Sequence, residues 1–174
     1  MNTALKLDPV GDGIHMPAGI VLRAGDQADA EAIHGVYLSA IHGLARGPYS
    51  EAQLRSWAAG LTAGGCRRAM ARGERYEVAV AQAGALVAFC ATLPGLIQAI
   101  YTDPGWAGRG IGTVLLARAE ARLFAAGHDP IHLRGALNAE GFYARRGWRA
   151  VSYGGHRTAG GLVLAAVRME KRAR

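Results

Sequence analysis

Three glycines within five residues carry the clearest chemical signal in this sequence, in the turn Gly108-Arg109-Gly110-Ile111-Gly112. An apolar run at 96–102 precedes the turn, and a helical pattern follows it. Glycines let the backbone approach a ligand, and the first turn of a helix has unpaired N–H donors and a partial positive charge. Arg109 adds a cation. The turn is therefore predicted to bind a phosphate or pyrophosphate.

Two common phosphate-binding motifs fit this turn poorly. A P-loop requires Gly-Lys-Ser/Thr, whereas Gly112 is followed directly by Thr113 without a lysine. A dinucleotide-binding turn requires a third glycine where Thr113 stands, within a parallel strand–helix–strand unit. The strands before this turn are instead predicted to be linked as hairpins. A tight turn without a ligand is the structural alternative.

The stretch from Ile100 to Leu116 resembles the cofactor-binding motif of the GNAT superfamily of N-acetyltransferases. The family pattern is Gln/Arg-x-x-Gly-x-Gly/Ala, and Gly110 and Gly112 match its two small positions. Ala107 stands where Gln or Arg is usual, which removes one side-chain contact near the pyrophosphate but no backbone donor. A second segment, Leu137 to Trp148, resembles the family's Asn-Ala-x-x-Phe-Tyr-x-x-x-Gly-Phe sequence. The resemblance covers about residues 20–170.

The resemblance implies that acetyl-CoA is the cosubstrate and that its acetyl group passes directly to a primary amine. It also implies that the backbone of 100–102 pairs with the pantetheine arm, while the turn holds the pyrophosphate. Asn138 has a second interpretation, as the cap of the helix that follows it. The expected cofactor-binding residues are Ile100, Tyr101, Thr102, Ala107, Gly108, Arg109, Gly110, Ile111, Gly112, Thr113 and Asn138.

Acetyl transfer to an amine needs a neutral amine, a donor for the oxyanion and a proton for the leaving thiolate. Tyr143 matches the family's usual general acid, and a tyrosine with a reference pKa of about 10 stays protonated at neutral pH. A backbone N–H near Tyr101 is the expected oxyanion donor. No general base is evident, because Gln98 cannot take a proton. His42, in a predicted loop, is the one candidate.

Two aromatic side chains are candidates for the acceptor site. Tyr49 and Trp57 lie in the region that shapes the acceptor pocket in the family that the chain resembles. Trp57 also fits the core face of a predicted helix. The nature of the amine does not follow from either residue.

Local patterns predict the elements that position these residues. Helices are expected after Asp26, after a capping box formed by Ser50 and Gln53, after Gly112, and over 139–146. A turn is expected at 42–48 and a break at 60–65. The strands are expected at 20–24, 76–81, 85–92, 96–102, 131–133, 151–153 and 162–169. This order predicts an α+β fold, with a GNAT-like mixed, mostly antiparallel central sheet flanked by about four helices.

Length and composition suit one globular domain, since 51% of the 174 residues are hydrophobic. Residues 1–18 are expected to be a flexible segment and residues 19–174 a single acetyltransferase domain. No signal peptide or membrane span is expected. The two cysteines suggest neither a disulfide framework nor a metal site, so a cytoplasmic location is predicted.

The formal net charge of +7 favours anionic ligands. The arginines are scattered, however, so nucleic acid is not an expected partner. The favoured function is N-acetylation of a small-molecule amine. A protein or peptide N-acetyltransferase, a nucleic-acid-binding module and a non-catalytic acetyl-CoA-binding domain remain as alternatives. A homodimer that pairs through the final strand, at 162–169, is left open.

Overall fold

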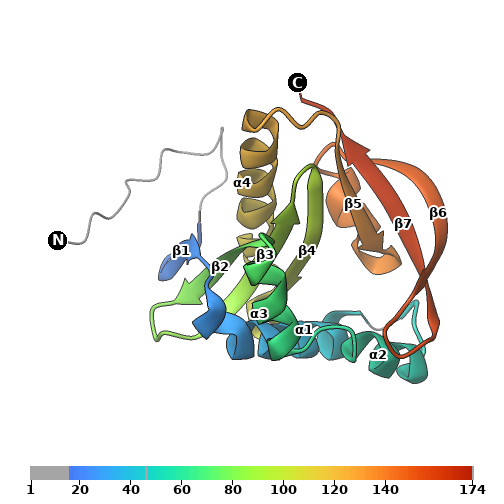
Figure 1. Cartoon of the computed structure of the whole chain (residues 1–174), viewed down its shortest axis with the longest axis horizontal. Coiled ribbons are helices and arrows are strands. Elements are labelled where there is room, and N and C mark those ends of the chain that lie inside the picture. Colours follow the sequence, from blue (N-terminus) through green and yellow to red (C-terminus); the bar gives the residue numbers. More distant parts are fainter. Residues whose placement is uncertain (1–15, 46, 174) are drawn as a thin grey trace.

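A seven-stranded mixed sheet organises the chain, with strand order β1-β2-β3-β4-β5-β7-β6 (Figure 1). The computed structural model describes residues 16–45 and 47–173, so most of the expected flexible segment, residues 1–15, lies outside the described residues. Neighbouring strands are antiparallel except β4 and β5, which are parallel. The strands are β1 (Ile20–Ala24), β2 (Arg75–Ala81), β3 (Leu86–Leu93), β4 (Leu96–Thr102), β5 (Ile131–Ala136), β6 (Arg149–Arg157) and β7 (Val163–Lys171). The predicted mixed, mostly antiparallel sheet is confirmed.

Helices cover both faces of this sheet. The helices are α1 (Ala30–Leu44), α2 (Glu51–Ala58), α3 (Ala63–Ala71), α4 (Ile111–Ala125) and α5 (Glu140–Ala144). The apolar face predicted for the first helix is confirmed, because Ile33, Val36, Tyr37 and Ile41 are buried with α2, α3 and one face of the sheet. Helices α4 and α5 pack on the opposite face. No helix among residues 16–45 and 47–173 is long and apolar enough to cross a membrane.

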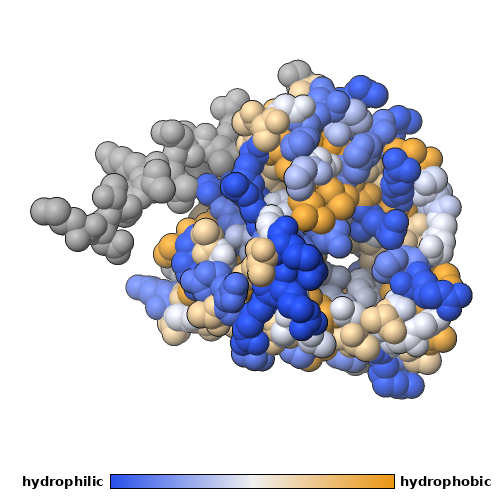
Figure 2. Space-filling model, viewed as in Figure 1, coloured by the Kyte–Doolittle hydropathy of each residue, from blue (hydrophilic) through white to orange (hydrophobic). Residues whose placement is uncertain are grey.

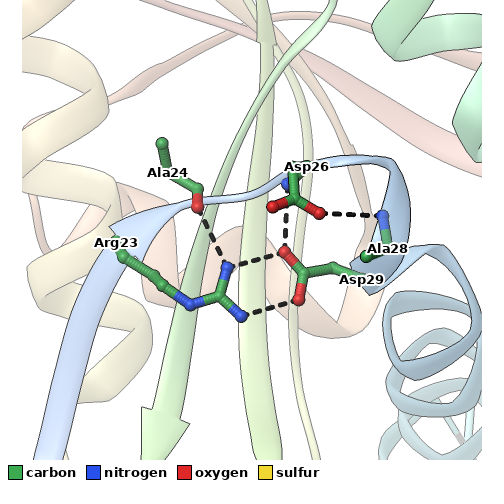
Figure 3. A network of polar contacts seen from close by, with 5 residues as sticks. All are labelled: Arg23, Ala24, Asp26, Ala28 and Asp29. Atoms are coloured by element: carbon green, nitrogen blue, oxygen red, sulfur yellow. Dashed lines mark hydrogen bonds and ion pairs between the residues drawn. The ribbon is translucent and has the colours of Figure 1, made fainter.

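A polar network joins β1 to α1 (Figure 3). The Asp26 carboxylate accepts a hydrogen bond from Ala28 N at 2.8 Å, and the Asp29 carboxylate accepts one from Asp26 N at 3.0 Å. The Arg23 guanidinium donates one hydrogen bond to each carboxylate oxygen of Asp29, both at 2.7 Å. This charged hydrogen bond holds the pKa of Asp29 below its usual value. The network fixes the turn through which the chain enters α1.

Two helical segments differ from the sequence prediction. Helix α1 runs to Leu44, so His42 lies in its last turn and not in a loop. Helix α3 begins at Ala63 and so occupies the second half of the segment 60–65 that was expected to be a break. Its N-cap, Thr62, accepts a hydrogen bond from Gly65 N at 3.0 Å, and Cys66 is fully buried. Consecutive glycines in its first turn lower the intrinsic helix propensity, and burial of its apolar face overcomes that cost.

The strands after α4 also extend further than predicted, and Gly154-Gly155, expected in a connection, lies inside β6. Strand β7 pairs with β5 on one side and β6 on the other. Its backbone groups are therefore already used within the chain, and the expectation that the final strand pairs between subunits is wrong. The edge strands of the sheet are β1 and β6.

The sheet opens between β4 and β5. These two strands pair only at Leu96–His132 and Ile97–Leu133, close to their beginnings. The register between β3 and β4 shifts at this point, so Gln98 forms a bulge that bends β4. Beyond the bulge the strands separate, and their carboxyl ends lead directly into the Gly-rich turn and the α5 segment. The fold thus places both sequence motifs at one opening.

Candidate active site

The exposed backbone edge of β4 forms one wall of the opening. Asp103 N donates to Val87 O at 2.8 Å. Bonded and non-bonded pairs alternate along an antiparallel ladder, so we infer that Tyr101 bonds to β3 while Ile100 and Thr102 turn their N–H and C=O groups toward the opening. The backbone N–H groups of Ile100 and Thr102, and not that of Tyr101, are therefore the candidates for the expected oxyanion donor.

The Gly-rich turn supplies a second set of free donors. Gly108 has a φ of +76° and Gly110, the N-cap of α4, a φ of +86°, which only glycine adopts without strain. Thr113 N and Val114 N both donate to Gly110 O. Among the described residues, the backbone N–H groups of 109–112 donate to no carbonyl outside the helix. These free donors and the helix dipole are features that the predicted anion site requires, and anion binding by the turn stays a prediction.

An arginine that the sequence analysis missed lies at this helix end. Arg146, just after α5, donates to Thr113 Oγ1 at 2.5 Å and to Phe142 O at 2.7 Å. Its guanidinium lies 3.9 Å from the centre of the Phe142 ring, and its Nε is buried without a hydrogen-bond partner in the described residues. Burial lowers the pKa of Arg146. Arg109, in contrast, is exposed and lies over Trp106 at 4.7 Å.

Tyr143 of α5 reaches the same opening. Its ring packs on β5, where a Cβ at Gly135 would lie 3.3 Å from Tyr143 Cε2. The ring also has edge contacts with Phe142 and Trp148. Its hydroxyl forms no hydrogen bond within the described part of the chain, and burial raises its pKa. Tyr143 therefore stays protonated at neutral pH, as a general acid must.

Asn138 does not cap the helix that follows it. The N-cap of α5 is Ala139, which forms no side-chain cap, and Asn138 Nδ2 instead donates to Leu44 O at 2.9 Å. The side chain ties the end of α1 to the connection after β5. It still lines the opening, so its amide oxygen remains available to a ligand.

Three cavities meet at Trp57, Gln98 and Tyr101. The strand-gap cavity, of about 180 Å³, lies between β4 and β5 and is lined by Ile100, Thr102 and Tyr143. The β7 cavity, of about 290 Å³, extends along β5 and β7, and the α3 cavity, of about 260 Å³, extends toward the end of α3. Figure 2 shows the molecule hollowed in this region, above α1 and α2.

The two candidate acceptor-site residues and the candidate base lie in different surroundings. Trp57 is half-buried at the junction of the cavities. Tyr49 lines the β7 cavity, but its hydroxyl donates to Ala165 O at 2.7 Å and accepts from Leu137 N at 2.9 Å, which makes it a structural bridge. His42 lines none of the three cavities, so the structure gives no support to its role as a base.

The connection between β6 and β7, residues 158–162, closes over α2 and is called the roof below (Figure 1). Ser56 Oγ and Thr158 Oγ1 lie 2.5 Å apart, and Leu162 N donates to Ser56 Oγ at 3.3 Å. Gln53 Nε2 donates to Val163 O at 3.0 Å. The roof is thus fastened to α2, and its residues Thr158 and Ala159 line the α3 cavity.

Several ionisable residues lining these cavities were not singled out from the sequence. Glu74 is the only carboxylate among the residues that line the three cavities, and burial raises its pKa. The basic lining residues are His132, Arg134, His156 and Arg168. They lie on three strands, and no local pattern marks them. Among the described residues, no three His, Cys, Asp or Glu side chains gather into a metal site.

Comparison with known proteins agrees with this geometry. Residues 45–173 match the acetyltransferase (GNAT) domain family. A GCN5-related N-acetyltransferase from Rhodopseudomonas palustris is 28% identical, with a TM-score of 0.83 over 92% of this chain and 100% of that one. The PaiA N-acetyltransferase from Thermoplasma acidophilum, solved with coenzyme A, is 22% identical, with a TM-score of 0.69 over 88% of this chain and 99% of that one.

A third similar structure is a phosphinothricin acetyltransferase from Sinorhizobium meliloti in complex with AcCoA. It is 20% identical, with a TM-score of 0.62 over 88% of each chain. At this identity it shows a shared fold, as does the Thermoplasma protein. No curated protein matches the sequence significantly.

Proposed function

The chain belongs to the GNAT family of acetyltransferases, and on that premise we propose that it transfers the acetyl group of acetyl-CoA directly to a primary amine of a small molecule. The observation that carries the proposal is the opening between β4 and β5. It has free backbone edges at Ile100 and Thr102, the N-terminus of α4 at one end and Tyr143 beside it.

The chemical groups around this opening fit acetyl-CoA. The edge of β4 offers donors and acceptors at the spacing of a missing strand, which suits the amides of the pantetheine arm. The free N–H groups of 109–112 suit the pyrophosphate. The unpaired Nε of Arg146 is buried beside the same helix end, where a phosphate would give it a partner. Similar structures were solved with coenzyme A or AcCoA bound.

Each chemical step has a candidate group in this site. The amine forms a new N–C bond to the acetyl carbon, and the C–S bond then breaks. Backbone N–H groups at the β4 edge stabilise the oxyanion, and Tyr143 gives its proton to the departing sulfur. An equivalent proton must return through water to the Tyr143 phenolate, and the attacking nitrogen must lose one proton, which balances the transfer. Glu74 is our candidate to receive it through water in the α3 cavity, because its raised pKa makes it a stronger base.

The roof favours a small acceptor over a protein chain. An enzyme that acetylates peptides needs an open groove across the site, whereas here residues 158–162 are fastened to α2 by the Ser56–Thr158 and Ser56–Leu162 hydrogen bonds. The β7 cavity, next to this roof, is large enough for a molecule of amino-acid size. Cys66 and Cys90 are both buried and unpaired, which agrees with a proposed cytoplasmic location.

Two measurements, made one after the other, test the proposal. Acetyl-CoA at about 100 times its dissociation constant should stabilise the folded protein by roughly 2.7 kcal/mol, seen as a rise in melting temperature. Release of the free CoA thiol is then measured with a panel of small amines and peptides. Thermal stabilisation without turnover of any amine or peptide would favour a non-catalytic binding domain. Turnover of peptides alone would refute the small-molecule assignment.

A further inference from the structure

Two arginines face each other inside the β7 cavity. Arg134 of β5 and Arg168 of β7 are register partners in an antiparallel pair, so their side chains leave the sheet on the same face, and both line the cavity. Like charges directly opposite each other across strands destabilise a sheet. Both arginines are exposed to solvent, which screens this repulsion, and an anion between the two guanidinium groups would turn it into attraction.

The protein itself offers these arginines little compensation. Arg134 Nη1 lies 3.0 Å from His156 Nδ1. A guanidinium can only donate, so His156 Nδ1 is the acceptor in this contact and supplies no negative charge. Arg168 has no hydrogen bond or ion pair with a residue in 16–45 or 47–173. No carboxylate lines the β7 cavity.

The acidic residue of β7 nearest to Arg168 in the chain is already paired with another arginine. Glu170, two residues beyond Arg168, accepts from Arg149 at 2.5 Å, and this bond holds its pKa below the usual value. His132, the register partner of Glu170, also lines the cavity, and its buried Nδ1 has no partner in the described residues. The cavity therefore presents two uncompensated positive charges together with imidazole groups.

We propose that Arg134 and Arg168 bind an anionic group of the acceptor, so that the acceptor is a small amine bearing a carboxylate or phosphonate, such as an amino acid. This inference rests on the proposed function. The remaining walls of the cavity include Trp57, Leu96 and Leu164, which suit an apolar side chain. Arginine pairs are well suited to an oxyanion because their planar forks donate two parallel hydrogen bonds.

The position of the cavity assigns this charge to the acceptor and not to acetyl-CoA. No residue of the turn 108–112 lines the β7 cavity, so the two proposed anion sites are separate. The β7 cavity meets the strand-gap cavity at Gln98, at Tyr101 and at Arg134, which lines both, whereas Arg168 lines only the β7 cavity of the three. An amine held by its acidic end at the arginines can thus extend its nitrogen toward the β4 edge.

The test compares matched acceptors. Rates of CoA release are measured for L-methionine and L-methioninamide, for L-phenylalanine and its amide, and for 2-aminoethylphosphonate and ethanolamine. The amides have the less basic amine, so a larger fraction of their amine is neutral near pH 7, which favours them in the absence of an anion site. We expect kcat/KM to be about ten- to a hundredfold higher for the acidic member of at least one pair, the range for a hydrogen bond to a charged group.

Variants identify the residues responsible. Arg168→Gln and Arg134→Gln should each reduce this preference by about tenfold, mainly through KM, and Arg168→Gln should leave the dissociation constant of acetyl-CoA unchanged. Arg55→Gln is the matched control, because Arg55 is exposed on α2 and lines none of the three cavities. It should keep the preference of the parent.

The outcomes separate this inference from the proposed function. Equal rates for acid and amide, a preference for the amides, or acetylation of other amines without any acidic one overturns the inference and leaves the acetyltransferase intact. Weaker acetyl-CoA binding in Arg168→Gln overturns it as well, because that arginine then serves the cosubstrate. Failure of the parent protein to bind acetyl-CoA would overturn the proposed function itself.

Discussion

Gly160 is the position where the roof approaches α2 too closely for any side chain. A Cβ there would lie 2.5 Å from Ser56 Oγ and 2.9 Å from Ser56 Cα. Ordinary contact begins at 3.4 Å, so in Gly160→Ala the roof must move by about 0.9 Å, the difference between 3.4 and 2.5 Å. Rotation of the serine does not relieve the second contact, because Cα belongs to the backbone. We therefore expect the roof to lift from α2.

The size of the effect follows from the hydrogen bonds that this movement breaks. Ser56 is bonded to Thr158 and to Leu162 N, and each bond contributes about 0.5–1.5 kcal/mol. Gly160→Ala should therefore lower the free energy of unfolding by about 1–3 kcal/mol. In a domain of this size that corresponds to a fall in melting temperature of about 2–4 °C for each kcal/mol.

The kinetic consequence tests the role of the roof. If it covers the acceptor, Gly160→Ala should raise KM for the amine severalfold and leave the dissociation constant of acetyl-CoA unchanged. Gly154→Ala is the matched control, since Gly154 lies in the same hairpin and a Cβ at this position would have no atom within 4 Å. An unchanged KM in a destabilised Gly160→Ala protein would show that the roof does not belong to the acceptor site. An unchanged melting temperature would contradict the contact itself.

Two further predictions concern the proton transfers. Tyr143→Phe should lower kcat about a hundredfold while acetyl-CoA binding and the melting temperature stay close to the parent; an unchanged kcat removes Tyr143 from the mechanism. Glu74→Gln should abolish the acidic limb of the pH profile of kcat/KM. Burial raises the pKa of Glu74 in the folded state, so the ionised carboxylate opposes folding, and stability falls as pH rises from the unfolded value of about 4.3 through the folded pKa. The melting temperature of Glu74→Gln relative to the parent should thus increase between pH 4 and pH 8, and a constant difference argues against a raised pKa.

Local sequence patterns were sufficient for much of the fold. Short apolar runs predicted β1 and β4 with the bounds that the structure shows, and Ser50 with Gln53 marked the start of α2 through a capping box. These features depend on residues close together in the chain. The positive φ of Gly110 at the start of α4 is a further feature of this kind. The turn 108–112 was predictable for the same reason.

Other features of the site had no local signal. Helix α3 was missed because its glycines disfavour a helix in isolation, and only the burial of Cys66 and its neighbours against α1 stabilises it. Arg146 lies 33 residues from Thr113 in the chain, and only the packing of α5 against the start of α4 brings their side chains together. Sequence spacing alone does not predict such a contact.

The sequence by itself determined the local structural features of this protein: the glycine turn, the helix caps and the strands that lead to them. The tertiary structure decided what surrounds them. The bulge at Gln98 opens β4 from β5, and strand order places Arg134 opposite Arg168 on a shared face. The physical reason is that backbone conformation depends on neighbouring residues, whereas a binding cavity depends on which distant strands become partners.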